Sequence, residues 1–131
     1  MKRILFAAIA MLAFAYSTAS QAAITSFDVT SATLSKSTGA STVTGTIVCT
    51  AGDVFFVQAN IVQVSGGHNG FTQGETAAAF CSGGVDTWVA PQTLVFGSIK
   101  NGNAQVFVES IDVTDGTVEF QLFHQPVHPA P

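Results

Sequence analysis

Hydrophobic and polar residues alternate through most of the chain after residue 22, and a period of two is typical of β-strands that bury one face. The clearest example is 42–49 (TVTGTIVC), which places on one face Val43, Gly45, Ile47 and Cys49. The next run, 54–64 (VFFVQANIVQV), alternates less perfectly and places on one face Phe55, Val57, Ala59, Ile61 and Gln63. We therefore predict strands over both segments.

Further strands are predicted at 24–34, at 75–81, around Trp88, and at 93–100, 104–113 and 117–123. Pro91 ends the short strand around Trp88 or confines it to a sheet edge, and the Gly-rich segment 65–74 is expected to be a loop. Asn101-Gly102 and Asp115-Gly116 are hairpin-turn signals, so the last three strands should form an antiparallel meander.

About seven short strands with turns every 8–12 residues predict an all-β fold, an antiparallel two-sheet β-sandwich of immunoglobulin-like shape, with a barrel as the alternative. True immunoglobulin order is absent, because Trp88 follows the second cysteine and does not lie between the two. The length of 131 residues is that of one domain. We expect this β-sandwich domain to span 23–123 and a Pro/His-rich tail to span 124–131.

The first 22 residues have the pattern of a cleaved secretory signal peptide. A short basic start (MKR) precedes an apolar run at 4–16, and Ser20-Gln21-Ala22 offers small residues at the cleavage site. A membrane anchor is the alternative, but thirteen apolar residues are fewer than the roughly 20 that span a bilayer. We therefore expect a secreted or periplasmic protein that is not inserted in a membrane after cleavage.

Removal of residues 1–22 leaves an acidic protein. Two basic residues, Lys36 and Lys100, and eight acidic residues remain, for a formal net charge of −6. Two lysines cannot form the basic surface that neutralises phosphate groups, so nucleic acids and anionic membrane surfaces are not expected partners.

Cys49 and Cys81 both follow the signal peptide, and a cysteine pair in a small exported domain is most often a disulfide. Two buried free thiols or a metal site are the alternatives. A spacing of 32 residues, without a CxxC motif or a nearby histidine, is weak support for zinc.

Short motifs around these cysteines carry a resemblance to a known family. The segment 45–52 (GTIVCTAG), then Cys81-Ser82-Gly83 and Trp88, resembles small secreted bacterial, actinobacterial-type immunoglobulin-like β-sandwich domains of unknown function, over about residues 43–110. The resemblance implies a sandwich fold, export and a structural disulfide, and it implies no activity. The segment 42–49 is also similar to the strand before the first cysteine of chaperone-usher pilins, but a pilin would not continue after Phe123 with an eight-residue tail.

Residues able to carry catalysis are few. The three histidines are His68 in the Gly-rich segment and His124 and His128 in the tail, and no GxSxG elbow accompanies them. Pro126 breaks the helical spacing that would make His124 and His128 a good metal clamp. We therefore predict a protein that is not an enzyme and has no cofactor, with these two histidines as weak metal-ligand candidates.

The acidic residues of the last hairpin have two interpretations. Segment 112–116 (DVTDG) could offer oxygen atoms to calcium, but it lacks the alternating acidic ligands of a calcium loop, so a hairpin turn is the simpler interpretation. Glu109, Asp112 and Glu119 are expected on the solvated face of that hairpin.

Loops on a rigid sandwich are common recognition sites. His68 and Phe71 in the Gly-rich segment, together with Trp88, are therefore candidates for a contact surface, although core packing is the simpler role for Trp88. We expect a non-enzymatic protein that binds a protein or cell-surface component through loops or an edge strand. The uncharged run 54–64 favours a self-assembling structural subunit as the alternative, and a small secreted inhibitor or metal-binding protein is a second alternative.

Overall fold

A computed structural model describes residues 23–65 and 68–131, so the predicted signal peptide lies outside the described residues. The described part is all-β, and it contains no helix that could cross a membrane. Its nine strands are β1 (Ile24–Leu34), β2 (Ser41–Cys49), β3 (Val54–Ser65), β4 (His68–Glu75), β5 (Ala79–Phe80), β6 (Val85–Gly97), β7 (Gln105–Asp112), β8 (Thr117–His124) and β9 (Val127–Pro129).

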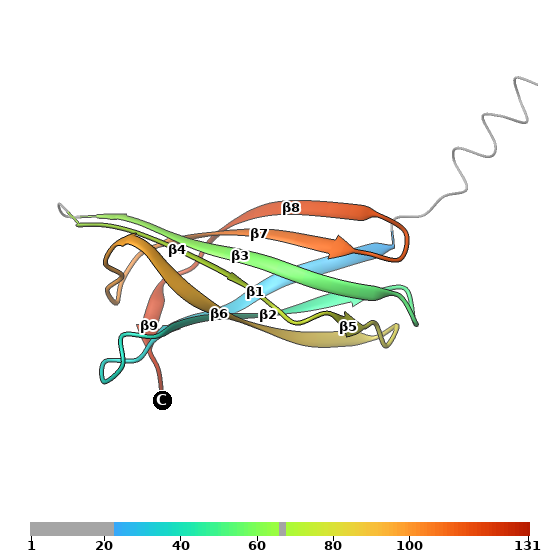
Figure 1. Ribbon diagram of the computed structural model, residues 1–131, viewed down its shortest axis with the longest axis horizontal. Coiled ribbons are helices and arrows are strands. Elements are labelled where there is room, and N and C mark those ends of the chain that lie inside the picture. Colours follow the sequence, from blue (N-terminus) through green and yellow to red (C-terminus); the bar gives the residue numbers. More distant parts are fainter. Residues whose placement is uncertain (1–22, 66–67) are drawn as a thin grey trace, which may run out of the picture.

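These strands form one curled, mixed sheet in the order β8-β7-β3-β4-β6-β2-β1-β9, and β5 pairs with one end of β3. Only β9 is parallel to its neighbour, β1. The sheet curls so that the half containing β1 and β2 faces the half containing β3 and β7 (Figure 1). The all-β prediction is therefore confirmed.

β6 connects the two halves because it pairs with different strands along its length. Residues 85–91 pair with β2, and 92–97 pair with β4. The prediction that Pro91 ends the short strand around Trp88 is wrong, since β6 continues through it to Gly97. The alternative, an edge position, fits residues 85–91, which pair with β2 only. Pro91 occupies the last pair of the ladder with β2, where a missing N–H disturbs the ladder least.

The Gly-rich segment predicted as a loop is mostly strand. β4 pairs with β3 on one side and with β6 on the other. A Cβ atom at Gly70 would collide with the carbonyl oxygen of Ser98, and one at Gly74 would collide with that of Pro91. These glycines therefore allow the backbone of β6 to lie against β4, which is a recognised role of glycine inside strands.

The predicted meander is only half correct. The β7–β8 hairpin is confirmed, but the second strand of the other predicted hairpin, β7, pairs with β3 and not with β6. The buried side chain of Gln63 holds the connection between β6 and β7 as a wide loop. It donates to the carbonyls of Lys100 and Asn103 and accepts from the amide of Lys100.

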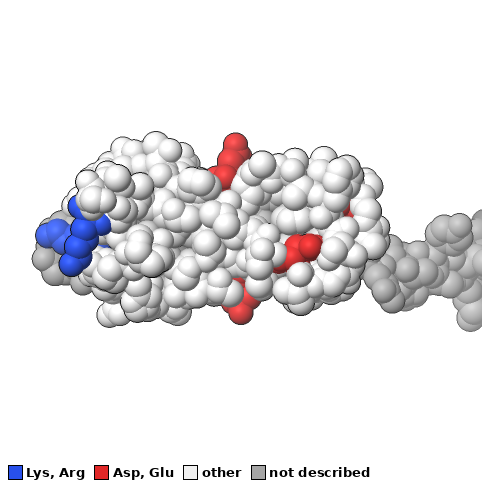
Figure 2. All heavy atoms as spheres, turned by 90° about the horizontal axis from the view of Figure 1, so that it is seen from below, with Lys and Arg blue, Asp and Glu red and all other residues white. Residues whose placement is uncertain are grey.

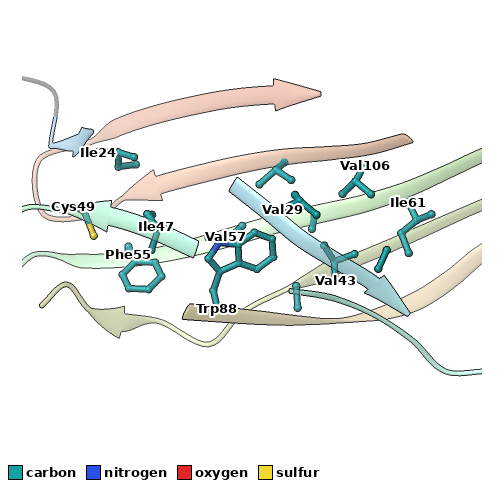
Figure 3. Close-up of a cluster of buried hydrophobic side chains, with 14 of the residues drawn as sticks. Ile24, Val29, Val43, Ile47, Cys49, Phe55, Val57, Ile61, Trp88 and Val106 are labelled. Atoms are coloured by element: carbon teal, nitrogen blue, oxygen red, sulfur yellow. The ribbon is translucent and has the colours of Figure 1, made fainter. Parts of the chain in front are cut away.

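The core lies between the two halves of the curled sheet (Figure 3). The predicted alternation in β2 and β3 is confirmed, because every residue on the expected faces is buried. Trp88 is only 3% exposed, and its indole Nε1 donates to the carbonyl of Thr46. Trp88 belongs to the same buried core cluster as Val57 of β3 (Figure 3).

The Cys49–Cys81 disulfide is confirmed and joins the halves at one end. Cys49 ends β2, whereas Cys81 follows β5, which pairs with β3. Backbone hydrogen bonds reinforce this junction, since the amide of Cys81 donates to the carbonyl of Asp53 and its own carbonyl accepts from Gly52.

The C-terminal residues are part of the fold and not a free tail. β8 continues to His124, and Val127, only 1% exposed, begins β9 beside β1. Val127 also exchanges two backbone hydrogen bonds with Gly102, and the amide of Ala130 donates to the carbonyl of Leu34. A buried valine between prolines therefore closes the sheet at its β1 edge.

Candidate functional site

Of the three residues proposed as a loop contact surface, one is buried, one lies in a strand, and the side chain of the third lies outside the described residues. Trp88 is buried in the core, so it does not contribute to a surface. Phe71 lies in β4, half-buried, and stacks on Phe96 of β6 with ring centroids 5.8 Å apart. The backbone of His68 begins β4, and its side chain lies outside the described residues.

The two candidate metal-binding histidines are both exposed but lie on different strands, His124 at the end of β8 and His128 in β9. Within 23–65 and 68–131, no group of three or more His, Cys, Asp or Glu side chains is placed to hold a metal ion. The geometry therefore adds nothing to the metal-binding hypothesis.

β8 is the long strand at one end of the sheet path. It pairs with β7 on one side, and no described strand pairs with its other side. Three large apolar side chains alternate along its outer face, and their exposed fractions are 52% for Val118, 66% for Phe120 and 43% for Leu122. This outer face carries no charged residue before His124.

The apolar surface continues onto the neighbouring strands, where it is interrupted at Glu109, which lies opposite Phe120. Val118 lies opposite Ile111 of β7, which lies opposite Phe56 of β3, and Leu122 lies opposite Phe107 of β7. Directly opposed residues share a face of the sheet. We call the whole set the β8 patch: Phe56, Phe107, Ile111, Val118, Phe120 and Leu122.

Large exposed apolar patches are rare on soluble monomers, and where they occur they commonly mark interaction sites. The unpaired edge adds backbone donors and acceptors that a further strand could use. The expectation of an exposed edge at 54–64 is wrong, because β3 lies inside the sheet, paired with β4, β5 and β7. In 117–123 apolar and polar residues alternate, so the pattern alone favours burial of the face with Val118, Phe120 and Leu122. The structure places this face outward.

The opposite end of β7 carries an acidic turn. Asp112 Oδ1 accepts from the amides of Thr114 and Asp115, as expected of a hairpin-turn aspartate. The prediction that Asp112 lies on a solvated face is wrong, since the residue is fully buried. Its Oδ2 has no donor among the described residues as long as Asp53 is ionised.

Asp53 is the neighbour of this buried carboxylate. The pKa of Asp53 is raised above its ordinary value of 3.8, first by a hydrogen bond with the Asp112 side chain, then by burial and by the charges of Asp112 and Asp115. A proton on Asp53 supplies the donor that Asp112 otherwise lacks. The neighbouring Asp112 side chain therefore favours the protonated form of Asp53.

Charge is distributed unevenly along the molecule. The lysine side chains lie together at one end, whereas acidic side chains appear further along the body (Figure 2). Lys36 lies in the connection after β1 and Lys100 in the connection after β6. Neither lysine lies on the strands of the β8 patch, so anionic partners have no cationic contact there.

No protein-family model matches the chain, and no curated protein matches it either.

Proposed function

We propose that this is an exported, non-enzymatic binding protein whose β8 edge receives an extended segment of a partner protein. The observation that carries this proposal is the exposed, uncharged outer face of β8 at an unpaired end of the sheet. In strand addition, main-chain hydrogen bonds supply affinity and alternate side chains supply specificity. The exposed side chains of the β8 patch would supply the specificity.

The proposal includes a two-sheet, immunoglobulin-like sandwich, as in the secreted bacterial domains that the sequence resembles. Its support is that the two halves of the curled sheet share one core and are joined by Cys49–Cys81. Export is supported by the same disulfide, because disulfides persist mainly in oxidising compartments. A signal peptide at 1–22 with a secreted or periplasmic mature protein is consistent with this chemistry.

Peptide selection on the oxidised chain 23–131 tests this function. A displayed library of random peptides is enriched on the native protein, and binding is then measured to Phe120→Ser and to a matched control, Phe80→Ser. Phe80 is an equally exposed strand phenylalanine, 75% against 66%, but it lies on β5. We expect Phe120→Ser to weaken binding and Phe80→Ser to leave it unchanged; no enriched peptide, or equal effects, would contradict the proposal.

A second copy of this chain is the second candidate partner, and the order of residues in β8 favours it. In an antiparallel pairing of two β8 strands centred on Phe120, Val118 of one copy lies opposite Leu122 of the other. In the same register, each Glu119 lies opposite Gln121, so the two carboxylates do not oppose each other. Self-association through β8 would make the protein a structural subunit.

Light scattering behind size-exclusion chromatography distinguishes the two candidates. A concentration-dependent dimer that Phe120→Ser dissociates, and that Phe80→Ser retains, would identify the second copy as the partner. A monomer at all concentrations would leave a foreign segment as the ligand.

A further inference from the structure

A second feature of the same sheet is a polar groove on the outer surface of β3, β4 and β6. Its volume is about 530 Å³, within the range of small-ligand sites. The groove opens where β6 leaves β4 to join β2. Its lining residues are Gln58, Asn60, Gln73, Gly74, Glu75, Pro91 and Thr93.

The hydrogen-bonding side chains of the groove are arranged in two rows across the strands. Gln73 lies opposite Thr93 of β6, and the flanking pairs Ala59–Gly74 and Val62–Phe71 place Asn60 in the same row. Gln58 lies opposite Glu75 in the next row. Neighbouring strands are about 4.8 Å apart, so each row presents a polar group at that interval. The strand backbone holds the rows in place, which limits the entropy lost when a ligand binds.

Most of these groups are free to bind a ligand. The side chains of Asn60, Gln73 and Thr93 form no hydrogen bond with any residue in 23–65 or 68–131. The one side-chain contact in the groove is a long one, from Gln58 Nε2 to Glu75 Oε2 at 3.5 Å. Amides and a hydroxyl offer both donors and acceptors.

An aromatic pair borders the first row. Phe71 is two residues before Gln73 on the same face of β4, and it stacks on Phe96, which is 57% exposed. The pairing of β4 with β6 shifts register by one residue between Phe71 and Thr72, because β6 has a bulge there. The aromatic pair lies on one side of this bulge, and Gln73 and Thr93 lie on the other. The groove therefore combines a polar floor with an apolar border.

The charge of the groove excludes anionic ligands. Glu75 lines it, and Glu109 lies opposite Gln58 on β7. The only two cations after residue 22, Lys36 and Lys100, lie in connections at one end of the molecule. A phosphate, sulfate or uronate would meet carboxylates here without a compensating cation.

We propose that this groove binds a neutral glycan. Sugar hydroxyl groups would exchange hydrogen bonds with Asn60, Gln73, Glu75 and Thr93, and the apolar face of a sugar ring would pack on Phe96. Strand addition by a peptide does not suit the site, because both edges of β4 are already paired. The two sites share no residue, but they adjoin on the same face of the sheet, where Asn60 lies opposite Phe107 of the β8 patch. The glycan proposal does not rest on the function proposed for β8, because the groove is argued from its own residues.

Titration of the oxidised chain 23–131 with neutral hexasaccharides tests this assignment. The probes are cellohexaose, maltohexaose, mannohexaose, xylohexaose and chitohexaose, with hexagalacturonic acid as the anionic comparison. Amide chemical shifts locate binding, and calorimetry measures affinity. We expect at least one neutral probe to shift the amides of 58–60, 73–75 and 91–93, and the uronate to leave them unchanged.

Variants make the test specific. Gln73→Ala should weaken binding about tenfold through the loss of hydrogen bonds to the ligand, whereas Gln121→Ala, a matched exposed glutamine on β8, should not. Unchanged thermal unfolding of both variants verifies the fold. The proposal is overturned if every neutral probe leaves the groove amides unshifted, if the shifts map elsewhere, if the uronate binds more tightly, or if both variants behave alike.

Discussion

Trp88 in β6 lies across the backbone of Gly45, its directly opposed partner in β2, and the indole occupies the space in which any side chain at position 45 would stand. The pair is anchored by the hydrogen bond from the indole Nε1 to the carbonyl of Thr46, 3.1 Å long. The largest side chain of the core is therefore accommodated by the absence of one on the facing strand. This explains why a glycine interrupts an otherwise β-branched strand.

Gly45→Ala should destabilise the protein. A Cβ atom there would collide with the Trp88 ring and with the carbonyl oxygen of Asp28, and overpacking of this kind costs roughly 1–3 kcal/mol. Urea unfolding followed by Trp88 fluorescence measures the loss. Gly84→Ala is the control, since the nearest atom to its Cβ would be Ser82 Oγ at 3.7 Å; an equal loss in both variants would contradict the packing argument.

Removing the disulfide should also lower the free energy of unfolding. Cys49 and Cys81 are 32 residues apart, and closing a loop of that length stabilises by about 3–4 kcal/mol on the chain-entropy account. Urea unfolding of the Cys49→Ala, Cys81→Ala double variant checks this value. Addition of a reductant should destabilise the wild-type protein and leave the double variant unaffected, and the wild-type mass should rise by two protons on reduction.

Gln63→Met should loosen the connection between β6 and β7. The substitution removes two hydrogen bonds donated by Gln63 to the carbonyls of Lys100 and Asn103 and one accepted from the amide of Lys100. Loss of such a buried network costs about 1–3 kcal/mol. Hydrogen exchange of the Lys100 amide should accelerate beyond the global change. Gln121→Met, on exposed β8, is the control and should alter neither measurement.

Asp53 should make the protein less stable as the pH rises. Its pKa is 3.8 in the unfolded chain and higher in the fold, so between these values the folded state binds more protons than the unfolded state. The free energy of unfolding therefore falls as pH rises through this interval, and the stabilisation is fully present only below it.

Asp53→Asn should remove this component, because the amide stays neutral and can donate to Asp112 at every pH. The variant should be at least as stable as the wild type at neutral pH and should show a flatter pH profile in urea unfolding. Glu75→Gln, an exposed carboxylate on β4, is the comparison. A variant whose pH profile matches that of the wild type would show that Asp53 is not responsible.

Local pattern was sufficient for the strands that bury one face. In β2 and β3 the alternation groups residues such as Val43 and Ile61 on one face, and these two are fully buried. The β7–β8 hairpin followed from the turn signal at Asp115-Gly116, because a two-strand hairpin depends on neighbouring residues only. The disulfide followed from cysteine count and the expected export.

Glycine and proline were misread because their meaning depends on partners distant in sequence. Gly70 and Gly74 indicated a loop, but they permit close approach of β6. Pro91 indicated the end of a strand, but it stands where β6 changes partners. Neither the close backbone contact nor the change of strand partner can be predicted from the ten residues around each position.

The β8 patch also depends partly on local sequence and partly on tertiary structure. The composition of β8 is evident in the sequence, but Val118, Phe120 and Leu122 point outward only because Val106 and Val108 of β7 fill the core behind them. The order of hydrophobic and polar residues determined by itself that this chain forms strands with a common core and a disulfide. Tertiary structure alone decided which strands became central and which remained open, because strand neighbours are selected by the packing of both sheet halves around one core and not by local preference.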